Sequence, residues 1–109
     1  MLVEPIEITP EPRLFVLTRR DLPWSVRAVQ AMHAATNLIA KRSQDIAAWG
    51  HYGPRLVLLG VSDERELQNY LRTLSEDMEP FFEPDLQGEL TAIAFLTLNN
   101  PPLGYLRLL

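Results

Sequence analysis

The chain has 109 residues, of which 14 are acidic and 10 are basic, and its formal net charge is −4. This length fits one domain with a single core, and a content of 47% hydrophobic and 22% charged residues argues against a disordered chain. No stretch approaches the roughly 20 apolar residues that span a bilayer. Without cysteine, disulfides and thiolate sites are excluded. The acidic total also argues against nucleic-acid binding, which needs clustered Lys and Arg.

The N-terminal part differs in composition from the rest of the chain. Residues 1–13 hold three prolines and three glutamates, which predicts an extended arm before a domain over residues 14–109. Glutamate stands where an export signal carries Lys or Arg, so we expect a cytoplasmic protein.

The first half of the domain predicts a strand followed by a helix. The apolar run 14–18 reads as a buried strand, and 26–41 reads as a helix with Ser25 as its N-cap. Alanines along this helix permit close packing. One of its faces carries an apolar stripe, formed by Val29, Met32, Thr36 and Ile39.

The second half predicts three more strands. A short helix or bent helix end over 46–49 precedes the apolar strand 55–61. Capping and acidic residues at 62–66 then begin a helix that has one apolar face. A third strand begins at Phe81, a fourth covers 90–96, and the apolar end permits a short fifth.

The resulting order, β-α-β-α-β-β, predicts an α/β domain with a mixed sheet flanked by helices. A helix between two buried strands makes those strands parallel, with a right-handed crossover. The third and fourth strands are close enough in sequence to form an antiparallel hairpin. A ferredoxin-like sheet is the main alternative.

Several kinds of site are excluded by the residues present. The only histidines, His33 and His51, lack a second strong ligand at a recognised spacing, and the five glycines are scattered rather than gathered in a phosphate loop. A nucleophile-elbow motif is also missing. We therefore expect neither a metal nor a cofactor.

Polar residues nevertheless gather where the first strand ends. In α/β sheets ligands bind beyond the carboxyl ends of parallel strands, and residues 19–21 leave the first strand at that edge. Gln30, His33 and Asn37 form a polar stripe on the following helix, at spacings of three and four residues. The alternative is that Gln30 and His33 satisfy hydrogen-bonding partners inside the helix packing.

A second polar group surrounds the predicted hairpin. Glu83 and Asp85 flank Pro84, and Thr91 begins the fourth strand. A carboxylate near an amide and a hydroxyl can orient a water molecule for attack on an ester. The alternative is a turn in which Asp85 holds the hairpin and Glu83 is solvated.

At these residues the chain resembles the type-two, archaeal and eukaryotic, peptidyl-tRNA hydrolases. The similarity runs through most of the chain from Leu14. It is carried in order by Val16-Leu17-Thr18-Arg19-Arg20-Asp21-Leu22, Ala28-Val29-Gln30-Ala31-Met32-His33-Ala34, Gly53-Pro54-Arg55 with Ser62-Asp63-Glu64, Phe82-Glu83 with Thr91-Ala92-Ile93-Ala94, and Tyr105-Leu106-Arg107-Leu108-Leu109.

The resemblance implies hydrolysis of the ester that joins a peptide to the tRNA ribose, without a metal or cofactor. Glu83 stands at the position of the family's catalytic aspartate and would orient or deprotonate water. Gln30 and Thr91 would position the ester, with His33 in the same site. The implied substrate- and phosphate-binding residues are Arg19, Arg20, Asp21 and Arg27.

The chain also departs from the family pattern. The family's lysine position falls on Val26, and Arg27 beside it is rotated by about 100° around the helix. The loop before Thr91 is shorter, and the last helix of the family is missing. These departures motivate a second hypothesis, a catalytically inactive relative that binds RNA or a protein.

Charge is unevenly distributed along the chain. Residues 1–60 carry seven basic and five acidic groups, whereas residues 61–109 carry three basic and nine acidic groups. Because local charge decides phosphate binding, the arginines near the first strand predict weak, salt-sensitive binding of tRNA on one face. Few helices cover the sheet, which predicts a homodimer.

Overall fold

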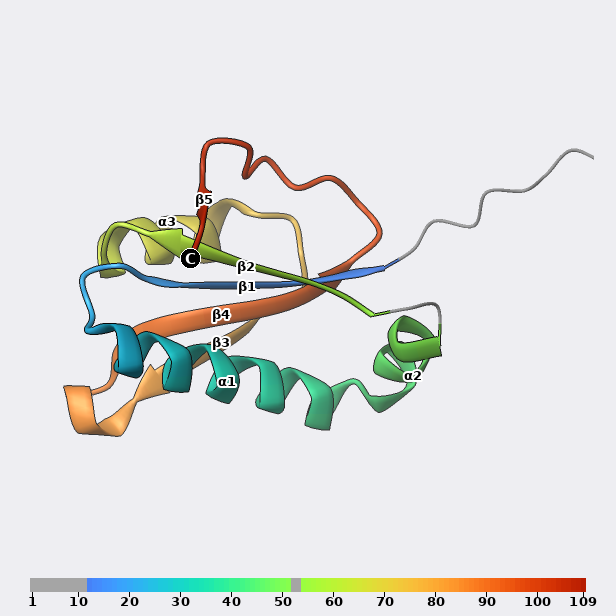
Figure 1. The fold of residues 1–109 in the computed structure, drawn as a ribbon, viewed down its shortest axis with the longest axis horizontal. Helices are drawn as coiled ribbons and strands as arrows, with labels where there is room; N and C mark the ends of the chain where they lie inside the picture. Colours follow the sequence, from blue (N-terminus) through green and yellow to red (C-terminus); the bar gives the residue numbers. More distant parts are fainter. Residues whose placement is uncertain (1–11, 52–53) are drawn as a thin grey trace, which may run out of the picture.

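The computed structural model describes residues 12–51 and 54–109, which form a five-stranded sheet with helices on both faces (Figure 1). The predicted arm lies mainly outside the described residues, and the first strand already begins at Arg13. The strands are β1 Arg13–Arg19, β2 Arg55–Val61, β3 Glu79–Glu83, β4 Glu89–Thr97 and β5 Arg107–Leu108. The helices are α1 Trp24–Lys41, α2 Ser43–His51, α3 Glu64–Thr73 and the short 3₁₀ helix η1 Pro84–Leu86.

The sheet has the strand order β3-β4-β1-β2-β5. β1 pairs in parallel with β2 and antiparallel with β4, while β3 and β4 form an antiparallel hairpin. The predicted α/β class, the parallel first pair, the hairpin and the short fifth strand are all confirmed. The observed order of elements differs from the β-α-β-β-α-β order of the ferredoxin-like alternative.

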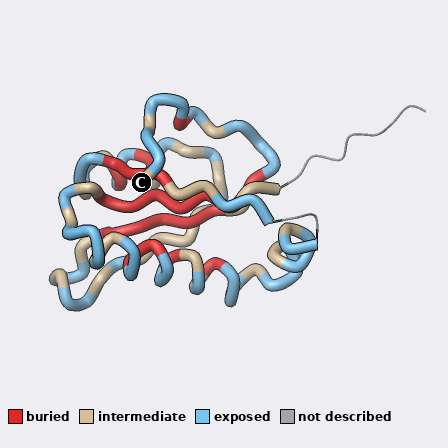
Figure 2. The backbone as a smooth tube through the Cα atoms, in the orientation of Figure 1, coloured by how far each residue is buried: buried red, intermediate tan, exposed pale blue. Residues whose placement is uncertain are grey.

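Two apolar cores lie on opposite faces of the sheet, so β1 and β4 are buried along most of their length (Figure 2). On the α3 face, alternate residues of β1 and β4 pack with α3 and the C-terminal segment; the largest buried side chains there are Phe15, Tyr70 and Phe95. On the α1 face the core is built of smaller side chains, including Leu14, Val16, Ala34, Ala92 and Ala94. The small residues let α1 lie close to β4.

α1 packs through a different face from the one that carries the large apolar side chains. Its buried residues are Gln30, Ala31, Ala34 and Leu38. The apolar stripe is instead exposed: Met32 is 69% accessible, Val29 50% and Ile39 42%. Ala31 and Ala34 pack with Ala92 and Ala94 of β4, and small side chains on both elements let the helix backbone lie close to the sheet.

α1 begins earlier than expected, and of the two alternatives for residues 46–49 the separate helix is confirmed. α1 begins at Trp24 with Pro23 as its N-cap, two residues before the predicted start at Val26, and Ser25 does not cap it. The Pro23 carbonyl accepts a hydrogen bond from the Arg27 amide at 2.9 Å, which closes the first turn. α2 is a separate helix that extends well beyond residues 46–49.

The predicted capping of α3 is confirmed. The Asp63 carboxylate accepts from the Glu66 amide at 3.0 Å, and the Glu66 carboxylate accepts from the Ser62 amide at 2.8 Å. This reciprocal arrangement satisfies two backbone donors at the helix start. Among the helices of the described segments, none combines the length and the apolar character needed to cross a membrane.

Truncating a side chain on the buried face of α1 tests the packing. We expect Leu38→Ala to lower the free energy of unfolding by roughly 2–5 kcal/mol, because it leaves a cavity. Leu98→Ala, at a position that is 58% exposed, changes it by less than about 1 kcal/mol. Urea denaturation followed by circular dichroism measures both values. A small loss at Leu38 would mean that α1 packs through its other face.

Candidate functional site

A β-bulge in β4 turns the Thr91 side chain toward α1. Phe81 of β3 pairs with Ala92, whereas its neighbour Phe82 pairs with Leu90, so Thr91 is an extra residue in the ladder. Regular alternation would turn Thr91 away from the face that Ala92 occupies. The bulge instead places both residues on the α1 side, an arrangement often found next to active sites.

Thr91 holds Gln30 by a buried hydrogen bond. The Thr91 hydroxyl donates to Gln30 Oε1 at 2.6 Å, and Gln30 is only 4% exposed. The Thr91 carbonyl accepts from the Thr18 hydroxyl at 2.9 Å, which fixes the bulge. The Gln30 amide nitrogen has no hydrogen-bond partner within residues 12–51 and 54–109, yet no buried side-chain polar atom there is left unpaired. The Gln30 amide nitrogen is therefore accessible from the adjoining cleft, which Gln30 lines.

This cleft lies between the first turns of α1 and the β3–η1 turn. Its volume is about 410 Å³, and it is lined by Ser25, Val26, Val29, Gln30, His33, Glu83, Asp85 and Leu86. The cleft therefore combines an amide, an imidazole and two carboxylates with an apolar wall. Gln30 and His33 of the polar stripe meet here with the hairpin carboxylates, which lie at least 50 residues further along the chain. The bulge and the apolar wall were missed, since neither has a local sequence signal.

The β3–η1 turn fixes the position of the Glu83 carboxylate. Glu83 is half-buried and is the N-cap of η1, where its Oε1 accepts from the Asp85 amide at 3.3 Å. The capping carboxylate is therefore that of Glu83, and Asp85 does not fill the turn-holding role considered above. Gln87 and Gly88 take positive φ angles and complete the turn. Glu83 Oε2 remains available to a ligand or water.

His33 lies on the rim of the cleft and stacks on β3. Its ring and that of Phe81 are 4.5 Å apart, with an interplanar angle of 11°. This contact orients an otherwise exposed imidazole beside Glu83 and Gln30. Asn37, the third member of the polar stripe, lies one turn further along α1 and does not line the cleft.

Arg19 is buried in a cluster of ion pairs. Its guanidinium donates to both oxygens of Asp21, at 2.9 and 2.8 Å, and to Glu89 at 2.8 Å. The hydrogen bonds from Arg19 hold the pKa of Asp21 below its ordinary value, and those to Asp21 raise the pKa of Arg19. Two carboxylates thus surround the one guanidinium, which leaves no excess positive charge for phosphate.

Arg20 and Arg27 bind backbone carbonyls. Arg20 donates to the carbonyls of Arg107 and Leu108 and lies over Gly60, where any side chain would collide with it. Arg27 donates to the carbonyls of Leu22 and Arg20 and lies over the Trp24 ring, 5.6 Å from its centroid. None of the three predicted phosphate-binding arginines lines the cleft.

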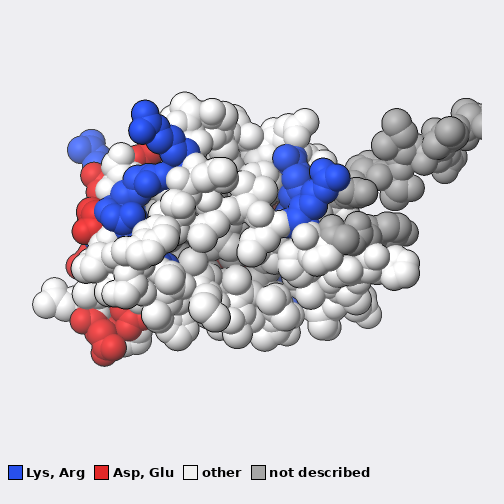
Figure 3. Space-filling view, viewed as in Figure 1, with Lys and Arg blue, Asp and Glu red and all other residues white. Residues whose placement is uncertain are grey.

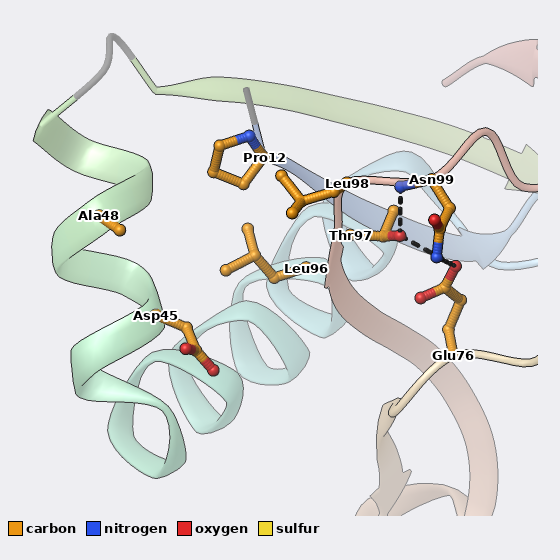
Figure 4. A pocket seen from close by; sticks show the side chains of 8 residues that line it. All are labelled: Pro12, Asp45, Ala48, Glu76, Leu96, Thr97, Leu98 and Asn99. Atoms are coloured by element: carbon orange, nitrogen blue, oxygen red, sulfur yellow. Dashed lines mark hydrogen bonds between the residues drawn. The ribbon is translucent and has the colours of Figure 1, made fainter. Parts of the chain in front are cut away.

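A second hollow, of about 510 Å³, lies at the other end of the sheet beside α2 (Figure 4). Its polar groups are largely engaged with one another: Glu76 accepts from the Thr97 hydroxyl at 2.9 Å and from the Asn99 amide at 3.4 Å. Pro12, Leu96 and Leu98 supply an apolar wall. We assign the candidate site to the first cleft, where an amide donor remains unpaired.

Within the described residues no cluster of three or more His, Asp or Glu is placed to hold a metal.

The Arg19 cluster predicts a specific acid dependence. Because the folded-state pKa of Asp21 is depressed, its stabilising contribution is complete above its unfolded pKa, near 4, and is lost as pH falls through the folded value. We expect Asp21→Asn to be less stable than the wild type at pH 7 and to lose less stability between pH 7 and pH 3. Urea midpoints at the two pH values test this. Equal losses in both proteins would contradict it.

Comparison with known proteins adds no assignment. No protein-family model matches the chain, and no curated protein matches it. The resemblance to type-two peptidyl-tRNA hydrolases therefore stays a prediction from the motifs quoted above.

Proposed function

We propose that this chain hydrolyses an acyl ester in the cleft between α1 and the β3–η1 turn. The observation that carries the proposal is the Gln30 side chain. Its carbonyl is fixed by Thr91, and its amide nitrogen opens onto the cleft that Glu83 also lines. An amide donor fixed in place before the substrate arrives is what stabilises negative charge on an ester oxygen.

The chemistry follows from these positions. Glu83 accepts a proton from water as the water oxygen attacks the ester carbonyl carbon. The Gln30 amide donates to the carbonyl oxygen as charge develops there. The bond between carbon and the ribose oxygen then breaks, and the proton held by Glu83 passes to that oxygen. His33 lies beside the path and can hydrogen-bond the ribose.

The substrate class comes from the sequence resemblance: we propose peptidyl-tRNA or a related aminoacyl ester, cleaved in the cytoplasm during translation. Arg20 and Arg27 each use only part of their N–H donors for backbone carbonyls. Their remaining donors would bind tRNA phosphate outside the cleft. Because these contacts are few and lie at the surface, the binding would be weak and sensitive to salt.

The alternative is an inactive relative that binds RNA or a protein without turnover. It is favoured by Val26, which lines the cleft where the family has its lysine, and by the engagement of Arg19 with two carboxylates. One measurement distinguishes the two functions. An ester hydrolase releases tRNA from an acylated tRNA, whereas the inactive relative binds without releasing it.

Replacement of the Glu83 carboxylate tests catalysis. With N-acetylaminoacyl-tRNA as substrate, we expect Glu83→Gln to lower kcat by about 10²- to 10⁴-fold, because the proton acceptor is lost. Glu79→Gln is the matched control at the other end of β3, where the carboxylate only pairs with Lys41. Binding of the substrate without turnover by the wild type would instead support the inactive relative.

The Gln30 donor is tested by a variant of similar shape. Gln30→Met removes the amide, and we expect kcat to fall by about 10²- to 10³-fold with little change in KM. Thr91→Val, which keeps the shape but frees the amide to turn, should cause a smaller loss. The two rates are measured on the same substrate. Unchanged kcat in Gln30→Met would show that the amide does not act on the reacting oxygen.

A further inference from the structure

The solvent-facing side of α1 is unusual because it is apolar and carries no charge. Between Arg27 and Lys41 the helix has no acidic or basic residue apart from His33. The surface over α1 is almost entirely white in Figure 3, and charged side chains gather at its margins. Solvated helix faces normally carry charged residues, and an exposed apolar stripe marks an interaction surface.

The spacing of the stripe is that of a helix pair. Its members, Val29, Met32, Thr36 and Ile39, are separated by three, four and three residues, as are successive a and d positions of a coiled coil. We call these four residues the α1 seam. Ala28, Ala35 and Ala40 flank it, so another helix can approach closely.

We propose that the α1 seam binds the α1 seam of a second copy of this chain in an antiparallel helix pair. The three-four-three spacing reads the same in both directions, as a two-fold interface requires. Val29 then lies opposite Ile39 of the second copy, and Met32 opposite its Thr36. The antiparallel direction also opposes the two helix dipoles favourably.

The absence of charged side chains on the α1 seam favours a second copy of the chain over a charged partner. Docking a charged partner on the seam would remove its charges from water without offering any counter-charge, which is costly. A second α1 seam brings only apolar and hydroxyl side chains. RNA is disfavoured for the same reason, because the seam presents no cation to phosphate.

The pairing has a consequence for the candidate site, and this step alone rests on the proposed function. Val29 belongs both to the α1 seam and to the wall of the cleft. The second copy would therefore place its Ile39 at the edge of the cleft, extending the apolar wall next to the ester. Each dimer would contain two such composite clefts.

Light scattering coupled to size-exclusion chromatography over a concentration series tests the pairing. The wild type should be a dimer. Met32→Lys should raise the dissociation constant at least about 100-fold, because it buries an unpaired ammonium. Leu98→Lys is the matched control, an exposed apolar residue outside α1, and should leave the dimer intact. Circular dichroism verifies that each variant is folded.

Mixing variants tests the direction of the pair. Met32→Lys and Thr36→Glu should each be monomeric alone and should form a heterodimer when mixed, since these positions face each other only in the antiparallel arrangement. Recovery instead on mixing Met32→Lys with Met32→Glu would overturn that direction. A wild type that is monomeric at every concentration, or a dimer that survives Met32→Lys, would overturn the proposal. These readouts need no substrate, so loss of the proposed ester hydrolysis would not affect them.

Discussion

β1 runs through the middle of the sheet and is buried on both of its faces, between β2 on one side and β4 on the other. A strand in this position cannot leave either face to water, because both faces carry apolar side chains. Helices must therefore cover the sheet from two sides, and the two cores have different characters. Large rings fill the α3 face, where Phe15 stacks on Phe95, and small side chains fill the α1 face.

The small side chains on the α1 face decide where the candidate site forms. Ala92 and Ala94 let the backbone of α1 approach β4, and the approach brings Gln30 within hydrogen-bond reach of Thr91. The bulge at Thr91 is what turns its hydroxyl toward the helix. A buried polar pair of this kind is favourable only when it is satisfied, so the side chain of Gln30 is held rigidly while its amide nitrogen opens onto the cleft.

The carboxylates and the arginines, which the sequence places near one predicted site, have different surroundings in the structure. The cleft holds two carboxylates, an amide and an imidazole, while the nearby arginines bind carboxylates or backbone carbonyls. Proton transfer at an ester suits the first set. In the proposed function, phosphate would bind the N–H donors that Arg20 and Arg27 retain, outside the cleft that the carboxylates line.

The sequence by itself determined the elements and their order, because strands, caps and turns depend on neighbouring residues. The apolar runs of β1 and β2 and the Asp63 cap of α3 are examples. It also indicated Gln30, His33 and Glu83 as candidates, since helical spacing places the first two on one face of α1 and Glu83 stands beside a turn.

Only the tertiary structure decided which face of α1 is buried. The stripe that carries Met32 is exposed, and the face with Ala31 and Ala34 packs closely on the small residues of β4. The tertiary structure likewise decided the orientation of the Thr91 side chain and the ion pairs of Arg19. Each depends on a partner in another element, Phe81 of β3 in the bulge and Glu89 of β4 in the ion pair, and periodicity within one element carries no information about such a partner.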